Sequence, residues 1–141
     1  LHLGDTCRGA YTVSQVSAGC KNRFEWLIAG TKGSVAWNQE RPDELWVGNR
    51  NEPNRIMVKD ASQFYPKAAG YCDYPGGHSE GYDDAHKQLY KRFWSRVADR
   101  SLPIEYPTFA DGLRGMQLLE AVMESNKKKG WVKCAPARGK K

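Results

Sequence analysis

The sequence predicts an α+β domain, with a mainly antiparallel open sheet of about four or more strands and two main helices packed on one of its faces. Two observations carry this prediction. Apolar residues alternate along short segments between residues 11 and 58, and they recur at steps of three and four after residue 82. The first spacing is typical of strands and the second of amphipathic helices.

The strand pattern begins with AYTVSQV at residues 10–16 and is clearest at residues 24–29, where Phe24, Trp26 and Ile28 alternate with Glu25, Leu27 and Ala29. GTKG at residues 30–33 then predicts a tight hairpin, since glycine supplies the positive φ that such turns use. A second pair of apolar runs, residues 45–47 and 56–58, flanks a segment rich in turn-forming residues. An antiparallel meander is therefore expected over this half of the chain.

Residues 60–81 contain too many glycines and prolines for a long element, and they predict an ordered loop or an active-site lid. A helix is expected from Tyr82, with Ser79 as its N-cap and acidic residues in its first turn. A second helix is expected after Thr108, which forms a capping-box pattern with Asp111, and it should end near Gly130. Residues 131–134 are expected to form a short closing strand.

The net charge of +6 depends on the C-terminal end of the chain. Seven of the 22 basic residues lie within residues 127–141, and no acidic residue follows Glu124, so the remainder is close to neutral. We therefore divide the chain into a domain at residues 1–134 and a basic tail at residues 135–141. The tail favours a solvated end, and we expect no nucleic-acid partner.

Four widely spaced cysteines indicate buried free thiols, because no C-x-x-C pair signals zinc or redox chemistry. The sequence has no apolar run long enough for a membrane span and no export signal, so no membrane partner and a cytoplasmic location are expected.

The densest polar cluster lies in PGGHSEGYDD at residues 75–84. His78 follows two glycines, a setting in which backbone can approach a ligand closely, and its imidazole could bind a hydroxyl or move a proton. Glu80, Asp83 and Asp84 could serve either a ligand or the start of the helix. A metal site that combines His78 and His86 matches no standard ligand spacing, and we expect none.

Four segments resemble the C-terminal domain of the Gfo/Idh/MocA oxidoreductases, the glucose-fructose oxidoreductase and inositol dehydrogenase family. They are VSQVSAG at 13–19, FEWLIAGTKGSVAWNQERPDEL at 24–45, PGGHSEGYDDA at 75–85 and PTFADGLRGMQLLEAVMESNKKKGWV at 107–132. The resemblance implies a parent protein whose Rossmann domain holds NAD or NADP, joined to an α+β domain whose open sheet forms a homo-oligomer interface.

The family's nucleotide-binding glycines, the lysine of its Glu-Lys-Pro motif and its Asp-x-x-x-His helix are not found in this sequence. The resemblance therefore implies a substrate and oligomerisation domain that starts partway through its parent and by itself binds no cofactor and is inactive. The parent would oxidise or reduce a sugar, polyol or related carbohydrate. His78, Tyr82 and Glu80 are the candidates for hydrogen bonds to substrate hydroxyls, and no catalytic residue is assigned within this chain.

A non-catalytic module that only self-associates through the sheet is the alternative. A strand followed by G-x-G-x-x-G in the longer reading frame would favour the enzyme. The substrate, the choice between NAD and NADP, and the choice between dimer and tetramer are left open by the sequence.

Overall fold

The computed structural model describes residues 1–134, so the expected basic tail at 135–141 lies outside the described residues. The chain divides into two compact units, the first at Leu1–Asp84 and the second from Ala85 onward. The elements in chain order are β1 (His2–Leu3), β2 (Cys7–Arg8), β3 (Glu25–Ala29), β4 (Gly33–Asn38), β5 (Glu44–Asn49), β6 (Arg55–Val58), the 3-10 turn η1 (Ala61–Gln63), α1 (Pro66–Ala69), α2 (Tyr82–Ala98) and α3 (Phe109–Lys128). This content confirms the predicted α+β class.

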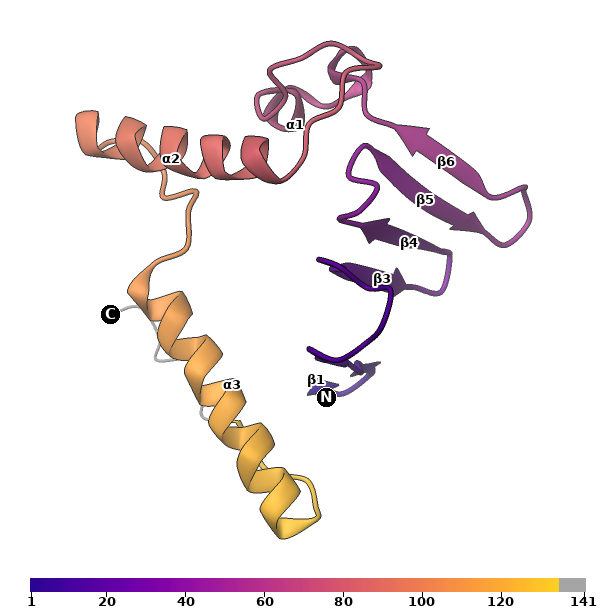
Figure 1. The fold of residues 1–141 in the computed structure, drawn as a ribbon, viewed down its shortest axis with the longest axis vertical. Helices are drawn as coiled ribbons and strands as arrows, with labels where there is room; N and C mark the ends of the chain where they lie inside the picture. Colours follow the sequence, from indigo (N-terminus) through magenta and orange to yellow (C-terminus); the bar gives the residue numbers. More distant parts are fainter. Residues whose placement is uncertain (135–141) are drawn as a thin grey trace. The chain divides into compact units, whose positions relative to one another are not determined.

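The first unit contains an open antiparallel sheet with the strand order β3-β4-β5-β6 (Figure 1). Each strand pairs with the next one in the sequence, as predicted for a meander. The first connection is the glycine-flanked turn, in which the Gly30 amide donates to the Gly33 carbonyl over 2.8 Å. Neither Gly30 nor Gly33 has the positive φ expected of this turn. Glycine is required at position 33 by the neighbouring strand instead, since a Cβ there would lie only 2.9 Å from the Gly48 carbonyl oxygen.

The register gives the two faces of the sheet different chemistry. Trp26, Trp37, Leu45 and Met57 form one cross-strand row, and Ile28, Val35, Val47 and Arg55 form the next row on the same side. We call this side face A. The opposite side, face B, carries the row Leu27, Ala36, Trp46 and Ile56, flanked by polar residues that include Glu25, Asn38 and Ser34. Face A is therefore mainly apolar, with Arg55 and Asn49 toward one end, whereas face B has polar residues on both sides of its apolar row.

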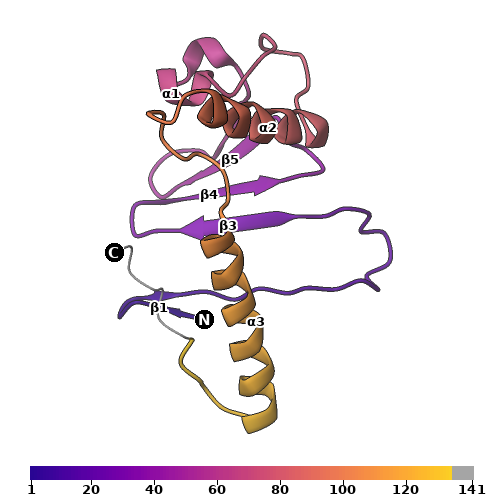
Figure 2. The same cartoon turned by 90° about the vertical axis from the view of Figure 1, so that its left-hand side faces the viewer.

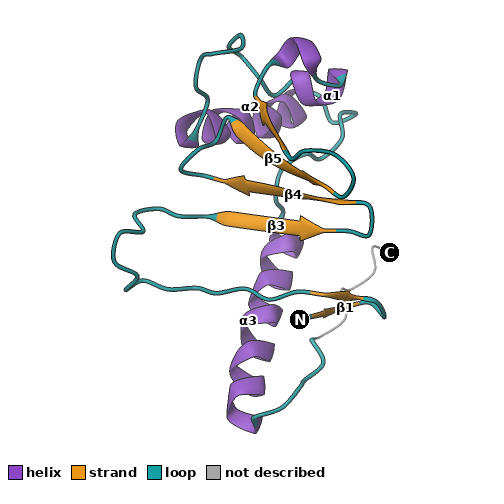
Figure 3. Ribbon diagram, turned by 90° about the vertical axis from the view of Figure 1, so that its right-hand side faces the viewer, coloured by secondary structure: helices purple, strands orange, loops and turns teal. Residues whose placement is uncertain are grey.

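The segment before the sheet differs from the prediction. Residues 10–16 form no strand and belong to a long loop that leads into β3 (Figure 3). A strand needs a neighbour to accept its backbone hydrogen bonds, and within residues 1–134 this segment pairs with none. Its β-branched residues Val13 and Val16 are 80% and 92% exposed. The short hairpin of β1 and β2 was not predicted.

The two long helices agree with the periodicity, and α3 is one unbroken helix (Figure 2). Thr108 and Asp111 form the predicted capping box, and Lys129 adopts the left-handed conformation just before Gly130. Ser79 is not the N-cap of α2, because the helix starts only at Tyr82; instead the Asp84 carboxylate accepts from the Gly81 amide over 3.0 Å. Neither long helix, nor any other helix within residues 1–134, is long and apolar enough to cross a membrane.

The predicted closing strand at residues 131–134 is also wrong, since these residues have no regular structure. A strand at this point would need a free sheet edge beside it, and no described strand pairs with the segment.

The described residues contain no fully buried apolar side chain, and large apolar residues of the sheet and both long helices are exposed. Contiguous apolar surface of this extent marks surfaces that other parts of a protein or its partners cover.

Candidate functional site

The candidate site is the segment from Asp73 to Asp84. It comprises most of the connection from α1 to α2 together with the first three residues of α2, and all of it belongs to the first unit. His78 and Tyr82 are exposed, whereas Glu80 between them is largely withdrawn from solvent. The three predicted substrate-binding residues thus lie on one short segment but in two different environments.

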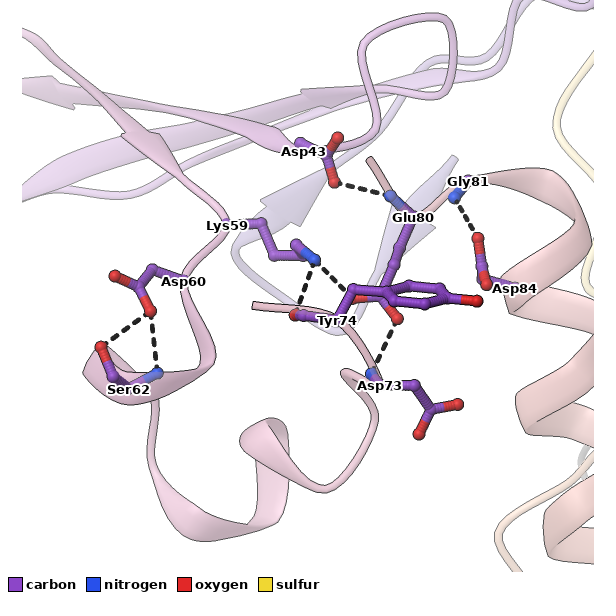
Figure 4. A network of polar contacts seen from close by, with 9 residues as sticks. All are labelled: Asp43, Lys59, Asp60, Ser62, Asp73, Tyr74, Glu80, Gly81 and Asp84. Carbon is purple, nitrogen blue, oxygen red and sulfur yellow. Dashed lines mark hydrogen bonds and ion pairs between the residues drawn. The ribbon is translucent and has the colours of Figure 1, made fainter. Parts of the chain in front are cut away.

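The Glu80 carboxylate binds a lysine side chain and backbone amide groups of the loop (Figure 4). One oxygen accepts from the Lys59 ammonium group over 2.5 Å, and the other accepts from the Asp73 backbone amide over 2.8 Å. The Lys59 and Glu80 side chains are only 11% and 7% exposed. Because a charge withdrawn from water is stable only when it is paired and hydrogen-bonded, these contacts account for an acidic residue at this depth.

Two hydrogen bonds to Asp43 connect this ion pair to the sheet. Lys59 directly follows β6, and its amide donates to the Asp43 carbonyl over 2.7 Å. The Asp43 carboxylate, which precedes β5, accepts from the Glu80 amide over 3.1 Å. The Lys59 ammonium group also donates to the Tyr74 carbonyl over 3.2 Å. Asp43 and Lys59, at the end of the sheet, therefore bind the loop through their side chains, and a main-chain hydrogen bond joins them to each other.

The charge states follow from these contacts. Burial raises the pKa of Glu80, but the hydrogen bonds from Lys59 and from the Asp73 amide outweigh it and hold that pKa below its usual value. Burial likewise lowers the pKa of Lys59, and the contact with Glu80 reverses this and leaves the pKa raised. At neutral pH the pair is a carboxylate and an ammonium ion, a state suited to holding structure in place.

Cys72 lies next to the ion pair, and burial together with the charge of Glu80 raises the pKa of its thiol. A raised thiol pKa disfavours the nucleophilic thiolate. All four cysteines are free, as predicted, but Cys7 is exposed and the other three are only partly buried, so the expectation of buried thiols is wrong. The four cysteines lie far apart in the sequence and are all free thiols, so they form no redox pair.

The remaining polar residues divide between the helix and solvent. Asp84 binds the Gly81 amide, and Asp83 lies exposed in the first turn of α2. His86 is exposed on α2. No group of histidine, cysteine and acidic residues within residues 1–134 could hold a metal ion.

His78 and Tyr82 are the exposed members of the predicted substrate-binding set. A neutral imidazole both donates and accepts a hydrogen bond, and so does a phenol, which suits both groups to hydroxyl-rich ligands. Their role toward a ligand belongs to the proposed function.

Sequence reasoning missed Lys59 and Asp43. They lie 21 and 37 residues from Glu80 along the chain, so no local spacing joins them to the loop. The available signal was that Asp43 stands just before one apolar strand run and Lys59 just after the next, so that an antiparallel pairing of the two runs brings them together.

Comparison with known proteins adds the family. Residues 1–134 match the C-terminal alpha/beta domain of the Gfo/Idh/MocA oxidoreductase family. The uncharacterized oxidoreductase YfiI of Bacillus subtilis (strain 168) is 25% identical, over 94% of this chain and 36% of its own length.

Solved structures of oxidoreductases share the fold. An oxidoreductase from Sinorhizobium meliloti has a TM-score of 0.79 and 32% identity, over 85% of this chain and 35% of its own. An inositol dehydrogenase homolog from Azotobacter vinelandii, complexed with NADH and myo-inositol, has a TM-score of 0.75 and 25% identity, over 83% and 33%. A levoglucosan dehydrogenase, in complex with NADH and L-sorbose, has a TM-score of 0.71 and 27% identity, over 84% and 32%.

The chain thus spans about a third of the length of the relatives that it matches. Since the family match covers residues 1–134, which include the sheet, the candidate loop and both long helices, the chain belongs to the Gfo/Idh/MocA oxidoreductases as their C-terminal alpha/beta domain.

Proposed function

We propose that this chain is the substrate-binding and oligomerisation domain of an NAD(P)-dependent oxidoreductase that acts on a sugar, a polyol or a related carbohydrate. The family match over residues 1–134 carries the proposal. Two of the similar structures, determined with NADH and either myo-inositol or L-sorbose, support a hydroxyl-rich substrate.

The described residues do not fit a nicotinamide cofactor. A dinucleotide binds at a glycine-rich turn between a parallel strand and a helix, whereas β3 to β6 are all joined as antiparallel neighbours. We therefore assign the cofactor to the rest of the parent and derive no step of its chemistry from this chain. The isolated domain is expected to bind neither NADH nor NADPH.

In this proposal the residues of this chain bind and orient the substrate. His78 and Tyr82 supply hydrogen bonds to hydroxyl groups, and correct orientation of a bound substrate lowers the barrier to reaction without direct participation in it. Glu80 is assigned a part in the site as well, but its carboxylate already binds Lys59 and the Asp73 amide, so it acts through the loop.

The experiment is steady-state kinetics of the full-length parent with NAD⁺ and NADP⁺ against a panel of polyols and sugars. His78→Ala and Tyr82→Phe should each raise KM or lower kcat by about tenfold, because each removes a hydrogen bond to a hydroxyl. The affinity for the cofactor should not change. Tyr65→Phe is the matched control, since Tyr65 is 87% exposed and lies outside the candidate segment.

Unchanged kinetics in both His78→Ala and Tyr82→Phe would remove the substrate-binding role from this segment. A parent that bound no nicotinamide cofactor and turned over no member of the panel would favour the alternative, a module that only self-associates.

Face B of the sheet is our candidate for the interface between copies of the parent. Its central row, Leu27, Ala36, Trp46 and Ile56, is apolar, with Leu27 64% and Ile56 61% exposed, and polar residues flank the row. An apolar centre with a polar surround is the composition of subunit interfaces, whereas the mainly apolar composition of face A is that of a domain interior.

A further inference from the structure

The loop that carries His78 is closed at its base by the Glu80 side chain. One oxygen of the Glu80 carboxylate accepts from the amide of Asp73, seven residues earlier in the chain. Residues 74–79 therefore form a loop whose two ends are joined by this hydrogen bond. We call the contacts that close it, made by Glu80, Asp73 and Lys59, the neck of the loop.

Lys59, which follows β6, binds both ends of the loop. Its ammonium group binds the Glu80 carboxylate at the end of the loop and the Tyr74 carbonyl at the beginning (Figure 4). Because both side chains are nearly excluded from solvent, water cannot easily replace either partner. One lysine therefore ties the two ends of the loop to the end of β6.

The tip of the loop is held by shorter contacts of its own. The His78 amide donates to the Pro75 carbonyl over 3.3 Å, and Gly77 between them has a φ of +84°, which favours glycine. On the flank, a Cβ at Gly76 would lie 3.2 Å from the Asp60 carboxyl carbon. Asp60 is itself fixed by the amide and hydroxyl of Ser62, at 3.0 and 2.7 Å. The backbone conformation at His78 is thus restricted by the contacts of the neck, by the turn from Pro75 and by the close approach of Asp60 to Gly76.

We propose that Lys59 and Glu80 are positioning residues, which fix the 73–80 loop so that His78 is held where it meets the substrate. The substrate part of this inference rests on the proposed function. The closure of the loop does not, since it follows from the contacts of the neck alone. Neither residue touches the substrate in this account, so their effect on the reaction passes through His78.

The first arm of the test measures the loop itself, by hydrogen exchange of the full-length parent. Glu80→Gln and Lys59→Met should each speed exchange of the Asp73 and Glu80 amides by about tenfold, since opening of the neck exposes both donors. Glu25→Gln is the control, because it removes the same charge from the exposed pair of Arg23 and Glu25. Exchange within about twofold of the unsubstituted protein in both neck variants would overturn the proposal.

The second arm measures the reaction. Each neck variant should raise KM for the substrate by about fivefold while KM for the cofactor stays the same, and the double variant should be no worse than the more severe single one, because the two residues act as a unit. Lys59→Arg should restore most of the substrate affinity that Lys59→Met loses, since it keeps the charge and the donors. Should Lys59→Met fail to fold, Glu80→Gln carries both arms, with Glu25→Gln as its control.

The outcomes separate this inference from the proposed function. If His78→Ala leaves the kinetics unchanged while the neck variants still loosen the loop, the substrate-binding role fails and the closure of the loop stands. If His78→Ala raises KM but the neck variants do not, or if they leave hydrogen exchange unchanged, the positioning role is overturned.

Discussion

The loop at residues 73–84 and the four-stranded sheet differ in where their side chains find partners. The loop is polar, and its most buried charges find their partners within the first unit, as Glu80 does in Lys59 and the Asp73 amide. The sheet is rich in apolar residues, yet Leu27 and Ile28 on its two faces are each 64% exposed. The polar groups of the loop find partners within the first unit, whereas the sheet presents apolar surface for other parts of the protein or its partners to cover.

This difference indicates which property of the domain depends on its surroundings. Full burial of one Leu or Ile side chain contributes roughly 1.5–3 kcal/mol, so several such residues on each face represent a large reserve of binding free energy. The hydrogen bonds of the loop gain nothing comparable from a partner. We therefore expect the sheet to govern assembly and the loop to govern recognition of the substrate.

The largest predicted effect compares two neighbouring residues of β3. Leu27 lies on face B and Ile28 on face A, with equal exposure in this chain. In the full-length parent, Leu27→Glu should lower the oligomeric mass measured by light scattering and leave a folded protein. Ile28→Glu should instead lower stability by about 3 kcal/mol or more, because it places a charge in a domain interior.

The two variants are matched in size, charge and position, so each is the control for the other. An unchanged mass for Leu27→Glu, with dissociation in Ile28→Glu, would exchange the roles that we give to the two faces. Unchanged mass in both would remove the sheet from the interface.

The second prediction concerns the pH dependence of the neck. The pKa of Glu80 is lowered in the folded protein, so its contribution is complete above the unfolded value of about 4.5 and is lost as the pH falls through the folded value. The pKa of Lys59 is raised, so its contribution is complete below about 10.5 and is lost as the pH rises further. The pair should therefore stabilise the domain between about pH 5 and pH 10.

Denaturant unfolding of the parent and of Glu80→Gln measures this contribution. We expect a difference of about 2 kcal/mol near pH 7, the scale for a buried charged hydrogen bond that loses its partner. The difference should shrink as the pH falls below about 4.5, because the carboxylate of the unfolded chain binds a proton there while the native carboxylate, with its lower pKa, is still ionised. A difference that stayed constant down to about pH 3 would show that the charge of Glu80 does not matter.

How far the sequence alone could predict the molecule depended on the distance between interacting residues. The turn between Gly30 and Gly33 and the capping box of Thr108 and Asp111 are each formed within three residues, and both were predicted. The strand at residues 10–16 was expected from its β-branched residues alone, but a strand also needs a neighbour to pair with, which residues 1–134 do not supply.

The candidate site shows the same limit. His78, Glu80 and Tyr82 stand out because they share one short segment, but Lys59 and Asp43 reach Glu80 only through the hairpins of the sheet. Their positions are set by the register of β5 and β6, which the sequence could suggest but not fix. The substrate-binding role of His78 and Tyr82 stays a prediction.

The smallest predicted effect concerns the capping box at the start of α3. It tests whether this local polar contact is independent of the sheet and of the loop. Thr108 accepts from the Asp111 amide, and the Asp111 carboxylate accepts from the Thr108 amide at 2.7 Å. Thr108→Ala should lower the free energy of local opening at the start of α3 by about 1 kcal/mol, because the Asp111 amide loses its acceptor. Native-state hydrogen exchange of the first turn of α3 in the parent measures this change, and Thr108→Ser, which keeps the hydroxyl, is the control. Because the capping box is a local contact, we expect no change in hydrogen exchange of the loop at residues 73–80 and no change in the oligomeric mass. A change in either would mean that the start of α3 is coupled to the surfaces that we assign to substrate and assembly.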